Sequence, residues 1–79
     1  MDKTSRLIAK GLLEEKKERL AQLEIKIERL TKDINYYLYT LDGIEAMRVE
    51  HARQAMEELV AAVHEYRLVA AEVRELSGK

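Results

Sequence analysis

The chain has 79 residues, of which 47% are hydrophobic and 37% charged, and it contains no Pro, Phe, Trp or Cys. This length supports one small domain, and the lack of Cys excludes disulfides, thiol chemistry and zinc–thiolate sites. Lys and Arg number 14 against 15 Asp and Glu, and this net charge of −1 provides no overall field to attract nucleic acid or an anionic membrane.

The first predicted element is a long helix over about residues 4–40. Its apolar side chains recur every three or four residues, a spacing typical of one apolar stripe on an α-helix. The stripe is broken at Lys16, whose aliphatic stem we expect to lie over Ala70 while its ammonium stays in water. The stripe consists of Leu13, Leu20, Leu23, Ile27, Leu30, Ile34 and Tyr37.

A tight turn is predicted next, over residues 41–44. Asp42, followed three residues later by Glu45, has the side-chain pattern of a capping box at the start of a helix. Gly43 either takes a positive φ that ends the first helix or occupies the first position of the second. Both alternatives predict an antiparallel turn.

The second predicted helix covers about residues 44–76 and carries a matching stripe. Folding the chain at Gly43 brings the two stripes face to face. The sequence therefore predicts an all-α, coiled-coil-like antiparallel two-helix hairpin that forms a single domain over residues 1–79. The expected pairs are Leu13 with Val73, Leu20 with Tyr66, Leu23 with Val63, Ile27 with Leu59, Leu30 with Met56, Ile34 with Ala52 and Tyr37 with Val49.

The second helix also carries a third apolar row, which we expect to lie outside the seam between the helices. A lone hairpin would leave this row in water, so it favours self-association into a homodimeric four-helix bundle, with the second helix inside and the first outside. Parallel and antiparallel dimers, and larger bundles, all fit the pattern. The expected self-association residues are Ala55, Ala62, Val69 and Leu76.

Catalytic and metal chemistry find little support in the sequence. His51 and His64 have no His, Asp or Glu at the spacing that would place a second metal ligand on the same helix face. There is no Gly-rich phosphate loop or nucleophile–base arrangement, so we expect no enzyme activity, cofactor or metal. An enzyme subunit or metal protein would need a site built across a dimer axis.

Membrane insertion is not expected, because no apolar run is long enough to span a bilayer. The polar N-terminal residues lack the apolar run of a signal peptide, which favours a cytoplasmic location.

Three tyrosines lie together just before the turn, and Tyr is favoured where proteins bind one another. Tyr37 belongs to the stripe, whereas Tyr36 and Tyr39 face outward and could bind a partner together with Leu38 and Met47.

The leading functional hypothesis is a non-enzymatic interaction module, that is, a small scaffold, adaptor or chaperone-like protein that self-associates and offers apolar helical surface to another protein. The alternative is a nucleic-acid-binding four-helix bundle, whose phosphate contacts would come from one row on the second helix. That row consists of Arg53, Arg67 and Arg74.

Overall fold

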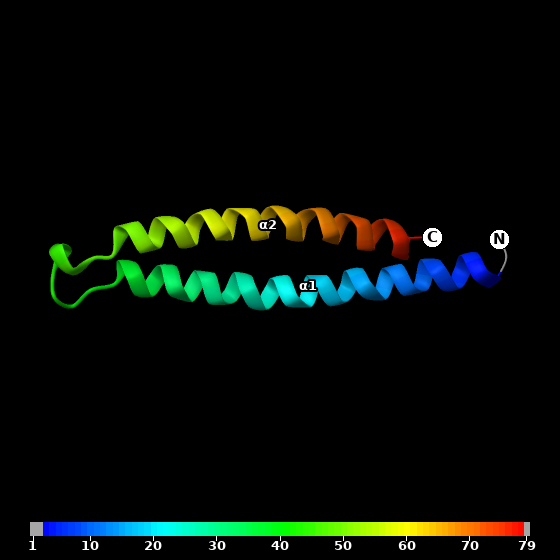
Figure 1. Ribbon diagram of the computed structural model, residues 1–79, viewed down its shortest axis with the longest axis horizontal. Helices are drawn as coiled ribbons and strands as arrows, with labels where there is room; N and C mark the ends of the chain where they lie inside the picture. Colours follow the sequence, from blue (N-terminus) through cyan, green and yellow to red (C-terminus); the bar gives the residue numbers. More distant parts are fainter. Residues whose placement is uncertain (1–2, 79) are drawn as a thin grey trace.

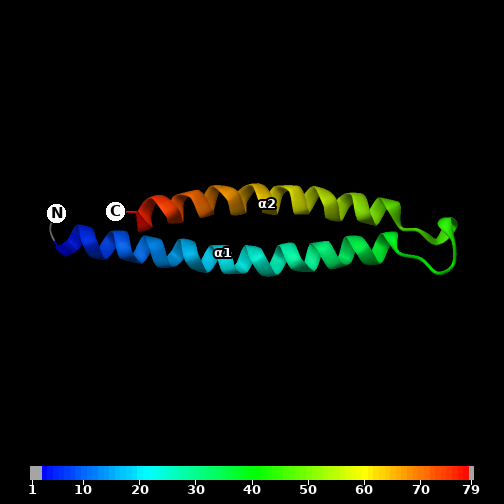
Figure 2. The same ribbon diagram turned by 180° about the vertical axis from the view of Figure 1, so that it is seen from behind.

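The computed structural model describes the backbone of residues 3–78 and the side chains of residues 8–78. Helix α1 spans Lys3–Leu38, helix α2 spans Val49–Ser77, and the connection between them contains one 3-10 turn, η1, at Ile44–Ala46. The two helices lie side by side and run in opposite directions, and the N-terminal turns of α1 extend past the end of α2 (Figures 1 and 2). The molecule is a rod with extents of 64 × 15 × 14 Å. The expected antiparallel helical hairpin is therefore confirmed.

The connection is longer than the sequence pattern suggests, because it covers residues 39–48 rather than 41–44. Gly43 has the positive φ that was one of the two expectations, at 99°, but it neither ends α1 nor begins α2. Instead it precedes η1, after which Met47 turns to an extended conformation with ψ of 128°.

The expected capping box is wrong. Arg48 precedes the first residue of α2 and makes no side-chain capping hydrogen bond. The backbone N–H of Asp42 donates to the hydroxyl of Thr40 at 3.0 Å, within the connection. The Asp-x-x-Glu pattern thus coincides with a single 3-10 turn. The backbone becomes extended directly after this turn, so no long helix begins there.

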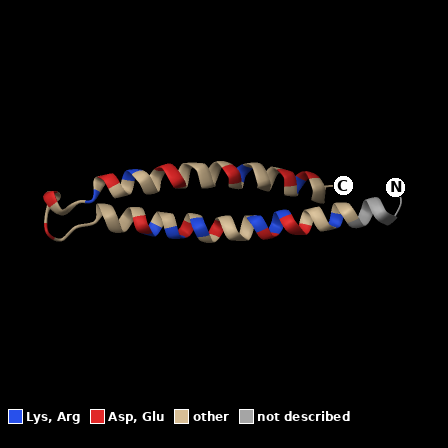
Figure 3. Ribbon diagram, viewed as in Figure 1, with Lys and Arg blue, Asp and Glu red and all other residues tan. Residues whose placement is uncertain are grey.

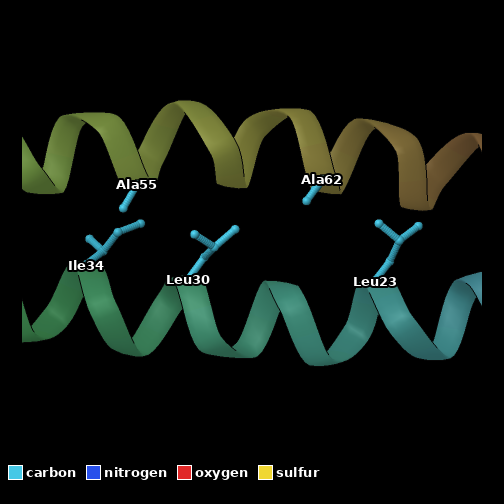
Figure 4. Close-up of a cluster of buried hydrophobic side chains, with 5 residues drawn as sticks. All are labelled: Leu23, Leu30, Ile34, Ala55 and Ala62. Carbon is cyan, nitrogen blue, oxygen red and sulfur yellow. The ribbon is translucent and has the colours of Figure 1, made fainter.

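The stripe expected on α1 forms the α1 side of the seam. Leu23 and Leu30 are each 1% exposed, and Ile34 is also buried. Ile27 and Tyr37 are partly buried against this cluster. Figure 4 shows the three buried side chains of α1 pointing at α2, where they meet two alanines. Burial of these aliphatic side chains supplies the main stabilising contact between the helices.

On α2 one of the two expected seam rows is confirmed, because Ala52 is 6% exposed and Leu59 and Tyr66 pack against the buried cluster. The second seam row differs from the expected one. Ala55 and Ala62, expected outside the seam, are 6% and 4% exposed and belong to the buried cluster. Val49 and Met56, expected inside it, are 53% and 46% exposed. The expected pairings of Tyr37 with Val49 and of Leu30 with Met56 are therefore wrong.

Side-chain size gives the physical reason for this difference. Several rows of apolar side chains on α2 repeat with the period of a helix. The spacing alone therefore does not show which of two neighbouring rows faces α1. Placing Ala55 and Ala62 opposite Leu23, Leu30 and Ile34 lets large side chains fill the space above small ones (Figure 4). Such interdigitation allows the helices to approach closely and leaves few voids.

Candidate interaction surfaces

One side of the seam is closed by ion pairs, and we call it the ion-pair side. Arg19 donates two hydrogen bonds to Glu65, from Nε to Oε2 at 2.6 Å and from Nη2 to Oε1 at 2.8 Å. These bonds hold the pKa of Glu65 below its ordinary value and raise the pKa of Arg19. One helical turn nearer the N-terminus, Lys16 pairs with Glu72. Charged side chains therefore bridge α1 and α2 along this edge.

Lys16 is partly buried, and it makes a contact that the sequence analysis missed. Its side chain is 24% exposed, which agrees with an aliphatic stem lying over the seam. Its ammonium does not stay free in water but forms the ion pair with Glu72.

The opposite side of the seam has a different composition. Glu24 accepts a hydrogen bond of 3.0 Å from the hydroxyl of Tyr66. Glu24 lies five positions after Arg19, which is a net rotation of about 140° around the helix, so the two side chains contact α2 from opposite edges of α1. The hydrogen bond to Glu24 raises the pKa of the Tyr66 hydroxyl.

Beyond this hydrogen bond, α2 presents an apolar row that α1 leaves uncovered. We call it the side stripe. Val49 and Met56 are about half exposed, Val60 is 63% exposed, and Val63 is partly buried. Their spacing places them on one face of α2. Figure 3 shows charged residues close together along the middle of α1 and more widely spaced on α2.

The four expected self-association residues now have a different place in the structure. Ala55 and Ala62 are buried against α1, and Val69 and Leu76 are partly buried. The expectation that this row lies outside the seam is wrong, because α1 covers it. Self-association itself stays a prediction. The apolar row left over on α2 is the side stripe.

The second exposed apolar surface lies at the end of the rod where the helices connect, and we call it the loop end. Tyr36 and Tyr39 are exposed there, and Leu41 and Ile44 are 86% and 84% exposed. An open pocket of about 280 Å³ lies beside Tyr36, Tyr39 and Leu41. It is lined by Tyr36, Tyr37, Tyr39, Thr40, Leu41, Asp42, Ala46 and Arg48.

Backbone hydrogen bonds connect the loop end to the helices. The N–H of Tyr39 donates to Asn35 O at 2.9 Å as α1 ends. The N–H of Arg48 donates to Tyr37 O at 3.0 Å, which ties the start of α2 to α1. The ring of Tyr37 packs against His51 at a centroid distance of 5.3 Å and against Tyr36 at 5.9 Å.

The structure brings together part of the partner-binding set expected from sequence. Tyr36 and Tyr39 line the pocket, whereas Leu38 and Met47 do not. The sequence analysis placed Leu41 in the turn but did not include it in the partner-binding set. The signal that could have revealed this exposure is its position directly before Asp42-Gly43, since Asp and Gly favour turns.

The arginine row of the nucleic-acid alternative is exposed on α2. Arg53 forms an ion pair with Glu50 at 3.3 Å. Val60 lies in the same row between Arg53 and Arg67, so the row is not continuously basic. The nucleic-acid alternative stays a prediction.

Among the described residues, no group of three or more His, Asp or Glu side chains is arranged to hold a metal ion. Within residues 3–78, neither helix has a segment long and apolar enough to cross a membrane. Comparison of the chain with protein-family models, with curated proteins and with solved structures finds no match in any of the three.

Proposed function

We propose that this chain is a non-catalytic protein-interaction module that binds an apolar segment of another protein at its loop end. The observation that carries the proposal is the exposure of Leu41, which is 86% exposed and lines a pocket together with Tyr36 and Tyr39. Ile44, in the same connection, is 84% exposed. Large aliphatic side chains are costly to leave in water, and a cluster of them on a protein surface marks a place where another molecule docks.

The composition of the loop end fits this role. Tyr offers a large contact area with few rotatable bonds and a hydroxyl that forms hydrogen bonds, which is why it recurs at binding hot spots. The pocket of about 280 Å³ between Tyr36, Tyr39 and Arg48 offers a place for one anchoring side chain. Backbone hydrogen bonds at Tyr39 and Arg48 anchor both ends of the connection to α1, which reduces the conformational freedom that binding must remove.

A peptide-library selection tests the proposal. The wild-type chain is immobilised, random peptides are selected on it, and the selected peptides are measured against the double variant Tyr39→Ser, Leu41→Ser. We expect peptides rich in aromatic and aliphatic residues that lose at least about tenfold in affinity on the double variant.

Ile25→Ser is the matched control. Ile25 is 70% exposed, close to the 71% of Tyr39, but lies in the middle of α1. It should leave peptide affinity unchanged. Failure to select any peptide, or equal losses for the loop-end variant and the control, would contradict a binding site at the loop end.

A further inference from the structure

We propose that two copies of this chain pair through the side stripes of their α2 helices, antiparallel, with Val60 of each copy against Val63 of the other. The inference rests on the proposed function only in treating the chain as an interaction module. It concerns a different surface from the loop end. The occupant of the side stripe is thus a second copy of the same hairpin.

The first argument is the position of the stripe around α2. The seam row of Ala55 and Ala62 and the stripe of Met56 and Val63 lie about a quarter turn apart around the helix. Each helix of a four-helix bundle contacts its two neighbours on faces separated by about that angle. One face of α2 is filled by α1, and the apolar side stripe remains for another helix.

The second argument is charge complementarity, which also selects the direction of pairing. Arg67 and Arg74 border the stripe, and Glu50 and Glu57 lie one row further out on the same side. When two α2 helices run antiparallel with Val60 opposite Val63 of the second copy, Glu57 lies beside Arg67 of that copy. The same alignment places Glu50 beside Arg74 of the second copy.

Other alignments satisfy fewer of these charges. Sliding one helix by two turns in either direction leaves only one of the two glutamates beside an arginine. In a parallel pair, residues of the same number meet across the interface. Arg67 would then face Arg67, and Arg74 would face Arg74, so like charges would repel at the edge of an apolar contact.

The Glu50–Arg53 contact within one chain is compatible with this dimer. The two side chains lie 3.3 Å apart and are 80% and 70% exposed, so the pair contributes little to the stability of the hairpin. In the dimer, the Glu50 carboxylate would lie between Arg53 of its own chain and Arg74 of the second copy.

The mass in solution tests whether the stripe is the interface. Size exclusion with light scattering over a concentration series should give a dimer. The variant Val60→Glu should raise the dimer dissociation constant by at least about a hundredfold, because each copy would bring a carboxylate into an apolar contact. Leu68→Glu is the matched control, since Leu68 is 54% exposed on another face of α2 and should leave the dimer intact.

Two results of that experiment would overturn the inference. The wild-type chain could remain monomeric at every concentration, or Val60→Glu could remain as dimeric as Leu68→Glu. Circular dichroism of each variant separates dissociation from unfolding, because a dissociated hairpin keeps its helical signal. Peptide binding at the loop end is measured separately, so either proposal can fail while the other holds.

Charge exchange tests the direction of pairing. Arg67→Glu alone and Glu57→Arg alone should each weaken the dimer by about tenfold. The two changes combined in one chain should restore its affinity, because the antiparallel dimer then has both ion pairs reversed. No recovery in the combined variant would contradict the proposed alignment.

Cross-linking gives an independent measure of direction, since the natural chain contains no Cys. A mixture of Glu50→Cys and Arg74→Cys chains, one carrying a mass tag, should form disulfides between the two variants. Each variant alone should not cross-link. Disulfides between two Arg74→Cys chains would show parallel pairing and overturn the proposal.

Discussion

The two sides of the interhelical seam are built from different side chains. On the ion-pair side, Lys16 and Arg19 of α1 reach across to Glu72 and Glu65 of α2. On the other side a hydrogen bond from Tyr66 to Glu24 joins the helices, and the apolar side stripe of α2 extends past it. A charged edge is well solvated as it stands, whereas an apolar edge gains from a further contact. The hairpin thus has one side whose charged groups are paired and solvated, and one side that leaves apolar surface exposed.

The largest effect on the free energy of unfolding is expected from a substitution in the centre of the seam, which weakens the contact between the helices on both of its sides. Leu30 is 1% exposed at the centre of the seam. Leu30→Ala should lower the free energy of unfolding by about 3 kcal/mol, through lost apolar burial and the cavity left behind. Urea unfolding followed by circular dichroism measures this loss. Ile25→Ala, on an exposed face of α1, should stay within about 0.5 kcal/mol of the wild type.

A substitution that enlarges a side chain, rather than shortening one, tests which row of α2 faces α1. Ala62 is 4% exposed, and its neighbour Ala61 is exposed. Ala62→Leu should destabilise the hairpin by about 2 kcal/mol, because the larger side chain must displace the leucines of α1. Ala61→Leu should have an effect within about 0.5 kcal/mol. Equal effects in thermal or urea unfolding would place the alanine row outside the seam.

These two positions also show how far the sequence predicts the fold. The stripe of α1 is identifiable because it is flanked by polar residues, and Leu23, Leu30 and Ile34 are buried as expected. On α2 two neighbouring pairs of rows have the same helical period, and one row of the selected pair was wrong. Side-chain size distinguishes the two pairs of rows, because Ala55 and Ala62 fit beneath large side chains of α1. A pattern that records only whether a residue is polar or apolar does not include the size of the side chain.

The candidate surfaces were predicted less completely than the fold. The exposure of Tyr36 follows from its position on α1, and Tyr39 is exposed as expected although it lies just beyond the end of that helix. The exposure of Leu41 depends on where α1 ends, and helix ends are set by backbone conformations in the connection that side-chain periodicity does not report. The side stripe could not be identified until the seam row of α2 was known, since the same apolar residues fit either role.

A smaller effect is expected from removing one charge on the ion-pair side. Glu72→Gln should lower the free energy of unfolding by about 0.5 kcal/mol, because the ion pair with Lys16 is partly exposed. The difference from the wild type should shrink in high salt, which screens exposed charges. Urea unfolding at low and high salt measures both quantities. A difference that persists unchanged in high salt would mean that packing, rather than charge, is lost.

The smallest effects are expected from pH, and they should distinguish the two sides of the seam. The pKa of Glu65 is lowered from 4.5, chiefly by its hydrogen bonds from Arg19. The contribution of Glu65 to the free energy of unfolding is therefore present above pH 4.5 and is lost as the pH falls through the lower folded-state pKa. The pKa of Tyr66 is raised from 10.0, chiefly by its hydrogen bond to Glu24. The contribution of Tyr66 to the free energy of unfolding is therefore present below pH 10.0 and is lost as the pH rises through the higher folded-state pKa. Melting temperatures across both ranges should therefore show that Glu65→Gln reduces the acid dependence alone, and Tyr66→Phe the alkaline dependence alone. If either substitution altered both ranges, the two sides would be coupled through the seam rather than independent.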